Sequence, residues 1–173
     1  MNEIVRCYLN DGSECELDKC DYVQLKLISS DEAYALVSKR SVDVILSFKW
    51  YVGKDGYPTG YGGRQRGIKM HKLVMQGVRG KVIDHINRNK LDNRLENLRI
   101  CTYKENSYNT SRRNNKFKGV KKISENKYAA TISKDGVSHS INNISSETEA
   151  AKIYDMMAEE LFGTFAGKNF GQS

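Results

Sequence analysis

The chain has 173 residues, of which 39% are hydrophobic and four are cysteines, and a formal net charge of +7. Enough apolar material is present for a buried core, which excludes a wholly disordered chain, and the cysteines are too few for a disulfide scaffold. No apolar run approaches the ~18–20 residues of a membrane span, and the N-terminus has no signal-peptide pattern. We therefore expect a cytoplasmic protein of one domain or two small ones, without a membrane partner.

The positive charge is concentrated in the middle of the chain. Residues 61–122 carry a net charge of +13, whereas residues 1–60 and 123–173 carry −3 each. Such a block is typical of proteins that bind a polyanion, because contacts with phosphates release counterions. A solvated basic face is the alternative, and charge alone would equally suit an RNA-binding protein.

The four cysteines are Cys7, Cys15, Cys20 and Cys101, and no two of them form a C-x-x-C pair. Structural zinc accepts four thiolates, so a zinc site that joins all four is one interpretation. The spacing is atypical for such a site, which favours the other interpretation, small buried side chains.

Residues 1–52 are typical of short strands, with apolar and polar residues alternating over residues 23–27. Residues 30–38 could form a short helix. The Asp-Gly pair within residues 54–60 predicts a hairpin turn. Residues 61–67 look like a flexible basic loop.

The next segment combines short apolar elements with an asparagine-rich loop. We expect a strand at 82–86, a loop at 87–96, a returning strand at 97–101 and a helix at 102–110. Thr102 and Glu105 have the spacing of a capping box at the start of this helix.

The C-terminal segment predicts a sheet and one amphipathic helix. We expect strands at 117–123, 127–133 and 137–141, followed by a helix from Ser146 to Gly163. Ser146 and Glu149 form a second capping-box pattern. The helix has an apolar stripe, and its opposite face carries three acidic residues: Glu149, Asp155 and Glu159. We expect the fold class to be α+β, with domains at 1–113 and 114–173.

Four residues of the middle segment could carry chemistry. Asp84 and Asn106 offer two hard oxygen ligands, which suit Mg²⁺ (or Mn²⁺) bound together with waters and phosphate oxygens. The imidazole of His85 is a candidate general base for attack of water on phosphorus. Asn97 on the facing strand could accept a hydrogen bond from His85 and fix its tautomer.

These residues lie in a pattern that resembles the HNH endonucleases, in particular the phage and intron homing-endonuclease branch. The resemblance covers roughly residues 30–112, and its motifs are Asp84-His85-Ile86-Asn87, Leu91-Asp92-Asn93-Arg94, Glu96-Asn97-Leu98-Arg99 and Asn106. It implies a ββα-metal fold, with a β-rich N-terminal extension, that cuts double-stranded DNA with one divalent metal inside a phage or bacterial host. Asp84 and Asn106 would then bind the metal, with His85 as the base and Asn97 orienting it.

The C-terminal segment resembles the Apetala-two/ethylene-response-factor DNA-binding domain over about residues 115–170. The matching motifs are Phe117-Lys118-Gly119-Val120, Lys127 to Ile132 and Glu149 to Asp155. Such domains lay a three-stranded sheet in the major groove. Lys118 and Lys121 match contact positions of that family. By alternation, Tyr128, Ala130 and Ile132 should face the helix, which leaves Lys127, Thr131 and Ser133 on the outer face. Ser138 and Ser140 replace Arg and Trp of the family, which predicts a weaker or different sequence preference.

Further cations are candidates for DNA phosphate contacts. They are Arg64, Arg66, Arg88, Arg94, Arg99, Arg112 and Arg113, with His71 either a phosphate contact or a helix start. Two other functions remain open: a non-catalytic DNA-binding regulator and an RNA-binding protein. Whether the chain acts as a monomer or a dimer is open as well.

Overall fold

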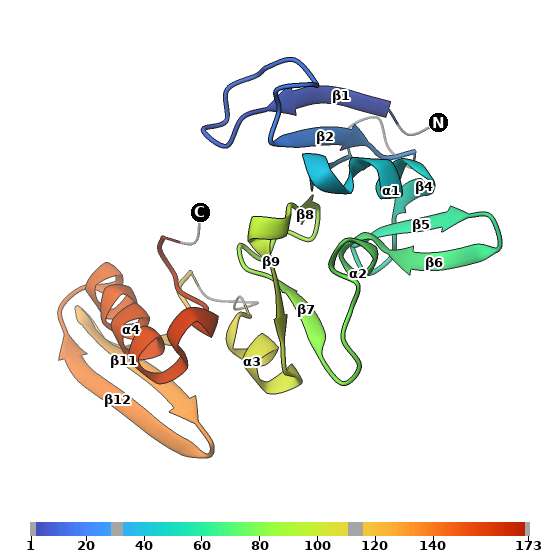
Figure 1. The fold of residues 1–173 in the computed structure, drawn as a ribbon. Coiled ribbons are helices and arrows are strands. Elements are labelled where there is room, and N and C mark those ends of the chain that lie inside the picture. The colour runs from blue at the N-terminus through green and yellow to red at the C-terminus, as the bar shows by residue number, and fades with distance from the viewer. Residues whose placement is uncertain (1–2, 29–32, 111–115, 172–173) are drawn as a thin grey trace. The chain divides into compact units, whose positions relative to one another are not determined.

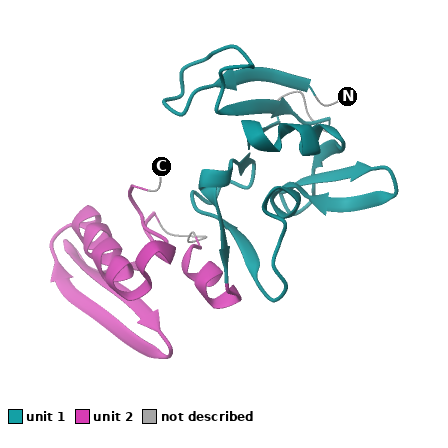
Figure 2. Ribbon diagram, in the orientation of Figure 1, with its two compact units in different colours: residues 1–101 teal, residues 102–173 magenta. Residues whose placement is uncertain are grey.

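The structure is a computed structural model that describes residues 3–28, 33–110 and 116–171. The chain forms two compact units, residues 1–101 and 102–173 (Figure 2). The division falls before α3 (Tyr103–Tyr108), whereas the sequence places a boundary at 113/114. The physical reason lies in the second unit, where the ring of Tyr108 stacks on Phe162 with centroids 4.0 Å apart.

A four-stranded sheet opens the first unit (Figure 1). The strands β1 (Glu3–Tyr8), β2 (Tyr22–Lys26) and β3 (Tyr34–Ser38) are antiparallel neighbours, and β8 (Asp92–Asn93) adds to β3 in parallel. The predicted alternation in β2 is confirmed. The helix expected at 30–38 is wrong over residues 34–38, because pairing with β2 buries alternate residues of that segment.

The next elements are η1 (Lys39–Ser41), α1 (Val42–Leu46), β4 (Lys49–Val52), β5 (Pro58–Gly62) and β6 (Gln65–Lys69). The predicted hairpin turn is confirmed, since β4 and β5 pair antiparallel and Gly56 has φ +79°. The flexible loop expected at 61–67 is wrong, because these residues form the β5–β6 hairpin around Gly63, with φ +55°.

Trp50 organises the core beside this hairpin. Its side chain is fully buried, and its indole N–H donates to the Ile45 carbonyl at 2.8 Å. A Cβ on Gly60 would lie 2.6 Å from the Trp50 ring, so the strand can pass the indole only at a glycine. This core supports α2 (Met70–Met75), whose first residue, Met70, is fully buried.

The motif segment follows as predicted. Strands β7 (Val82–His85) and β9 (Leu98–Cys101) pair antiparallel, and the single-turn helix η2 (Leu95–Asn97) leads into β9. In the second unit α3 begins with the predicted capping box: Glu105 N–H donates to the Thr102 hydroxyl, and the Glu105 carboxylate accepts from the Thr102 N–H.

The second unit contains the predicted sheet and helix. The strands β10 (Val120–Ser124), β11 (Lys127–Lys134) and β12 (Val137–Ile144) form an antiparallel sheet in chain order, followed by α4 (Glu147–Phe162) and η3 (Gly163–Phe165). Buried side chains of α4 and the sheet form one core, which includes Ala130 and Ile132 as expected from the alternation.

Two expectations for α4 need correction. Glu149 N–H donates to Ser146, but the Glu149 carboxylate accepts from Ser145, so only half of the predicted capping box forms. Asp155 is not on a solvent-exposed face. It is buried, and its carboxylate accepts hydrogen bonds from the backbone N–H groups of Asn169 and Phe170. It thereby holds Asn169 and Phe170 against the helix.

No helix within the described parts of the chain has the length and hydropathy that crossing a membrane requires.

Candidate active site

Asp84 and Arg99 face each other across the β7–β9 pair. Arg99 donates from Nε and Nη2 to Asp84 Oδ2, at 2.9 and 2.6 Å, and only 6% of Asp84 is exposed. A buried carboxylate needs such a partner, because it loses its hydration on folding. The sequence made Arg99 a candidate for a phosphate contact, whereas the structure pairs it with Asp84, the candidate metal ligand.

His85 follows Asp84 and is 4% exposed. Its Nε2 lies 3.4 Å from Oδ1 of Asn93, whose amide nitrogen donates to the Lys90 carbonyl at 3.2 Å. The second bond turns the amide oxygen of Asn93 toward the imidazole. Burial lowers the pKa of His85, although Asn93 and the negative charges of Asp84 and Asp92 oppose this shift. The ring is therefore neutral at neutral pH, as a base requires.

An aromatic cluster surrounds His85. The rings of His71 and His85 meet edge to face with centroids 5.2 Å apart, and Tyr57 lies 4.9 Å from His71 and 5.7 Å from His85. Burial and the neighbouring His85 lower the pKa of His71 to about 4. His71 is the second residue of α2, so the helix-start interpretation holds. At 6% exposure its ring presents little surface to a phosphate.

Asn97 closes the loop that carries Asn93. Its Oδ1 accepts from the Asn87 N–H at 2.9 Å, and its amide nitrogen donates to the Asn87 side chain and to the Asp92 carbonyl at 2.9 and 2.8 Å. The sequence suggested that Asn97 orients His85 directly. Asn97 holds the loop through these hydrogen bonds, and Asn93 lies 3.4 Å from the imidazole. A direct hydrogen bond from His85 to Asn97 stays a prediction.

Arg94 is a second cation that the structure pairs with a buried carboxylate. It donates from Nε and Nη2 to the two carboxylate oxygens of Asp92, at 2.8 and 2.7 Å, and its guanidinium lies 4.7 Å from the Tyr22 ring centroid. Ser38 accepts from the Leu95 N–H at 2.8 Å. These contacts and the β3–β8 pairing attach the loop to the N-terminal sheet.

The described residues contain no group of three or more His, Cys, Asp or Glu side chains that could hold a metal ion. The proposed zinc site at Cys7, Cys15, Cys20 and Cys101 thus gains no support; Cys20 and Cys101 are buried, and all four are free thiols. Burial raises the pKa of Cys7 and of Cys15, which opposes the thiolate form that zinc needs. Asn106, the other candidate ligand, lies on α3 in the second unit.

The other candidate DNA contacts differ in exposure. Arg64 and Arg66 are exposed on the β5–β6 hairpin, and Arg88 has φ +64° in the loop after β7. Arg112 and Arg113 lie outside the described residues. Lys121, Ser133, Ser138 and Ser140 are exposed, and Thr131 is half-buried with its hydroxyl 3.1 Å from that of Ser140.

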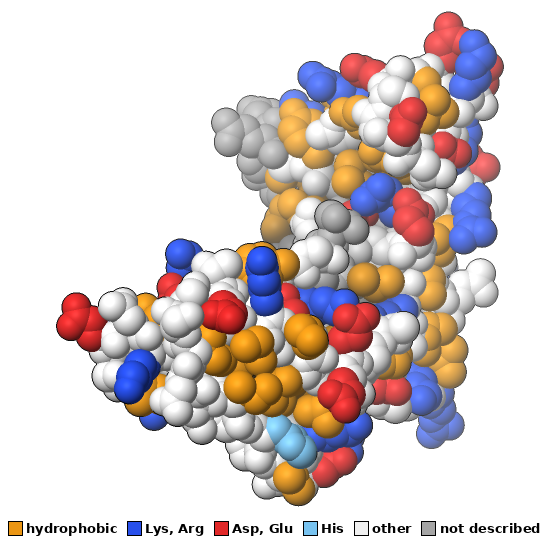
Figure 3. Space-filling view, turned by 90° about the vertical axis from the view of Figure 1, so that its left-hand side faces the viewer, with side chains coloured by type: hydrophobic (Ala, Val, Ile, Leu, Met, Phe, Trp, Pro, Cys, Tyr) orange, Lys and Arg blue, Asp and Glu red, His pale blue; other side chains and the backbone are white. Residues whose placement is uncertain are grey.

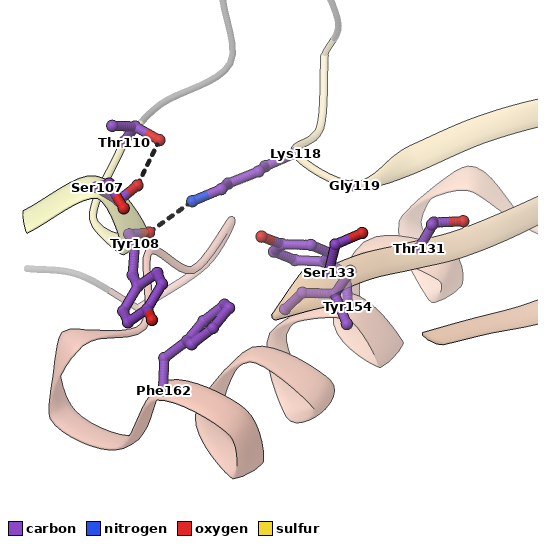
Figure 4. A pocket seen from close by; sticks show the side chains of 10 residues that line it. Ser107, Tyr108, Thr110, Lys118, Gly119, Thr131, Ser133, Tyr154 and Phe162 are labelled. Atoms are coloured by element: carbon purple, nitrogen blue, oxygen red, sulfur yellow. Dashed lines mark hydrogen bonds between the residues drawn. The ribbon is translucent and has the colours of Figure 1, made fainter. Parts of the chain in front are cut away.

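Lys118 is the exception among the expected contacts of the second unit. Its ammonium donates to the Tyr108 carbonyl at 2.7 Å, and it lines a pocket of about 430 Å³ (Figure 4). Thr131, Ser133 and Tyr154 also line this pocket. Lys118 thus holds α3 within the unit, so its ammonium is partly committed to packing.

Comparison with known proteins assigns the family. A sequence model described as HNH endonuclease matches residues 78–108, the segment of β7, the loop, β9 and α3. The chain is 46% identical over 140 residues to "Uncharacterized HNH endonuclease L560" of Acanthamoeba polyphaga mimivirus, covering 79% of this chain and 74% of that protein. It is 34% identical over 92 residues to "Protein 3.8" of Escherichia phage T7, covering 51% and 75%. No solved structure matches.

This chain belongs to the HNH endonuclease family. The matched segment includes Asp84, His85, Asn97 and Asn106, the residues that the sequence singled out.

Sequence reasoning missed three contributors to this site: Asn93, Tyr57 and the pairing of Arg99 with Asp84. Asn93 could have been found from the sequence, because an asparagine in an asparagine-rich loop can hydrogen-bond a neighbouring side chain as well as form a turn. Tyr57 carried none, because it reaches His85 from the β4–β5 turn, 28 residues earlier in the chain.

Proposed function

We propose that this protein is an endonuclease that hydrolyses phosphodiester bonds of double-stranded DNA with one divalent metal. The observation that carries the proposal is the buried His85, kept neutral and held by Asn93, directly after the arginine-paired Asp84. A neutral imidazole beside a carboxylate is suited to generate a nucleophile next to a cation.

His85 is the general base of the proposed reaction. When Nε2–H donates to Asn93 Oδ1, the basic lone pair of the neutral ring is on Nδ1. A water gives its proton to Nδ1, and its oxygen forms a bond to phosphorus while the bond to the 3′ oxygen breaks. The leaving 3′ oxygen takes a proton from solvent water, so the products carry 5′-phosphate and 3′-hydroxyl ends.

The residues present fit a divalent metal in donor type. Asp84 offers a buried carboxylate that Arg99 already holds in one orientation, and Asn106 is proposed as second ligand on motif spacing alone. Two oxygen donors suit Mg²⁺ or Mn²⁺, which keep waters and share phosphate oxygens with their substrate. A metal there would stabilise charge on the leaving oxygen.

The second unit is proposed to bind DNA through the outer face of its sheet. Thr131 pairs with Ser140 and Ser133 with Ser138 across β11 and β12, on the face opposite to buried Ala130 and Ile132. Lys121 is exposed on β10. Small hydroxyls with one lysine contact phosphates and bases without the bidentate guanine contact that arginine makes, so we expect weak sequence preference.

A cleavage assay on supercoiled plasmid tests the proposal. With Mg²⁺ the protein should convert the plasmid to nicked or linear forms, and EDTA or Asp84→Asn should abolish this while DNA binding persists. Binding without cleavage under all metals would identify a non-catalytic DNA-binding regulator. Binding of RNA in preference to duplex DNA would identify an RNA-binding protein.

A further inference from the structure

The third strand of the C-terminal sheet has an open edge. The order β10-β11-β12 places β12 at the end of the sheet, with no strand of the described residues beside its outer edge. Residues 137–143 are all exposed. Backbone N–H and C=O groups along such an edge are a template for pairing with another strand.

This edge lacks the usual protection against pairing. Residues 137–146 include no Lys, Arg, Asp, Glu or Pro, in a chain of which 28% is charged. The opposite edge strand, β10, carries exposed Lys121 and Lys122. Edge strands commonly avoid association through charged residues and proline. The β10 edge has this protection, and the β12 edge does not.

Apolar side chains line the open edge on one face. Val137 and Ile141 are 58% and 46% exposed, and their partners in the register are Lys134 and Ala130. Paired residues share a face, so both lie on the side of the sheet that α4 covers over β11. His139 is exposed on the same face, opposite Ile132 in the register. Figure 3 shows a face of the molecule where hydrophobic side chains gather beside an exposed histidine.

The sequence of the edge is complementary to itself. Residues 137–141 read Val-Ser-His-Ser-Ile, which has nearly the same pattern in both directions. In an antiparallel pair centred on His139, Val137 lies opposite the partner's Ile141 and Ser138 opposite the partner's Ser140. Pairs of β-branched residues and of hydroxyl residues stabilise antiparallel strands, and an antiparallel pair of identical strands has the two-fold symmetry of a closed dimer.

We infer that β12 is a self-association edge, through which two copies of this chain pair antiparallel around His139 and join their sheets into one of six strands. The occupant is a second copy because the register matches the strand to itself. The pairing does not depend on nuclease activity. If the proposed function also holds, it brings two nuclease centres to one complex, the number that a double-strand cut needs.

Light scattering after gel filtration tests the inference on the full chain. At increasing concentration the mass should approach twice 19.7 kDa. Val137→Lys combined with Ile141→Lys should return the mass to that of a single chain. Both positions are exposed in the monomer, so the variant should keep its fold, which circular dichroism checks. Ile123→Lys, on the exposed opposite edge, is the matched control and should still dimerise. A chain that stays monomeric, forms larger assemblies, or dimerises with both lysines present overturns the inference.

A cross-link tests the register. Opposite residues of an antiparallel pair have Cβ atoms about 4.5–5.5 Å apart, so a strand movement of about 1 Å brings them to the roughly 3.5–4.5 Å of a disulfide, whereas diagonal neighbours are about 7–8 Å apart. Under mild oxidation His139→Cys should therefore form a dimer that reducing agent dissolves, and Ser138→Cys and the wild type, with its own four cysteines, should not. Equal cross-linking of the three proteins would refute the register.

Discussion

His85 Nε2 lies 3.4 Å from Asn93 Oδ1, and the amide of Asn93 is held in that orientation by the Lys90 carbonyl. The imidazole proposed as the base is thus oriented by the loop between the two strands of the hairpin. Asn97 and the Asp92–Arg94 pair hold this loop, and therefore Asn93, in place.

Asn93→Ala should lower the single-turnover cleavage rate about 10-fold to 100-fold, part of the ~10²–10⁴ that a positioned base contributes. The reason is the loss of the amide oxygen that fixes the imidazole. The concentration of DNA that gives half-maximal rate should stay unchanged, since Asn93 is fully buried. A variant that cuts at the wild-type rate would show that Asn93 does not orient the base.

Asn97→Leu should loosen the loop. It removes the acceptor of the Asn87 N–H and the donor to the Asp92 carbonyl, and an unsatisfied buried group costs about 1–3 kcal/mol. Hydrogen exchange should therefore show a faster amide at Asn87. Asn97→Asp keeps the acceptor oxygen, so the exchange rate of the Asn87 amide should stay closer to that of the wild type. Equal exchange in all three proteins would show that Asn97 does not hold the loop.

His71 predicts how stability changes with pH. Its pKa is about 4 in the folded protein and near 6.5 in the unfolded chain, so below pH 6.5 the unfolded state binds more protons. The free energy of unfolding should fall as pH drops from 6.5 to 4, by about 3 kcal/mol at 1.36 kcal/mol per unit. Urea titrations should show this fall in the wild type and a smaller one in His71→Phe. Equal falls would mean that His71 does not titrate as described.

Gly119→Ala should destabilise the second unit. Gly119 has φ +71°, and its added Cβ would meet the Tyr154 ring at 1.9 Å. We expect about 1–3 kcal/mol from overpacking in addition to the cost of the left-handed backbone, measured by thermal unfolding. Gly136→Ala separates the two effects, because Gly136 has φ +82° with no atom within 4 Å of its Cβ. The account is wrong if the two variants lose equal stability.

Local signals in the sequence predicted much of the fold. The hairpin strands β7 and β9, the Thr102 cap and the three strands of the second unit depend on short-range alternation, turn residues and capping pairs. The failures came from strand pairing that the composition of each segment alone does not indicate. The segment Tyr34–Ser38 is a strand because β2 lies beside it, and residues 61–67 are ordered because β5 and β6 pair around Gly63.

The candidate site divides in the same way. The sequence singled out four motif residues as candidates, but which neighbours they contact depends on register and loop packing. Arg99 was assigned to phosphate because of its charge, whereas its place opposite Asp84 follows from the β7–β9 register. The role of Asn93 depends on β8 reaching β3, which no local pattern indicates.

The most direct test of the account is the cleavage rate of His85→Ala in Mg²⁺, measured on plasmid under single-turnover conditions, with duplex binding measured on the same preparation. The exposed Glu16→Ala in the first unit serves as the control and should match the wild type. We predict that His85→Ala loses at least about 10²-fold in rate and binds DNA as the wild type does. Cleavage by His85→Ala at the wild-type rate would contradict the central claim.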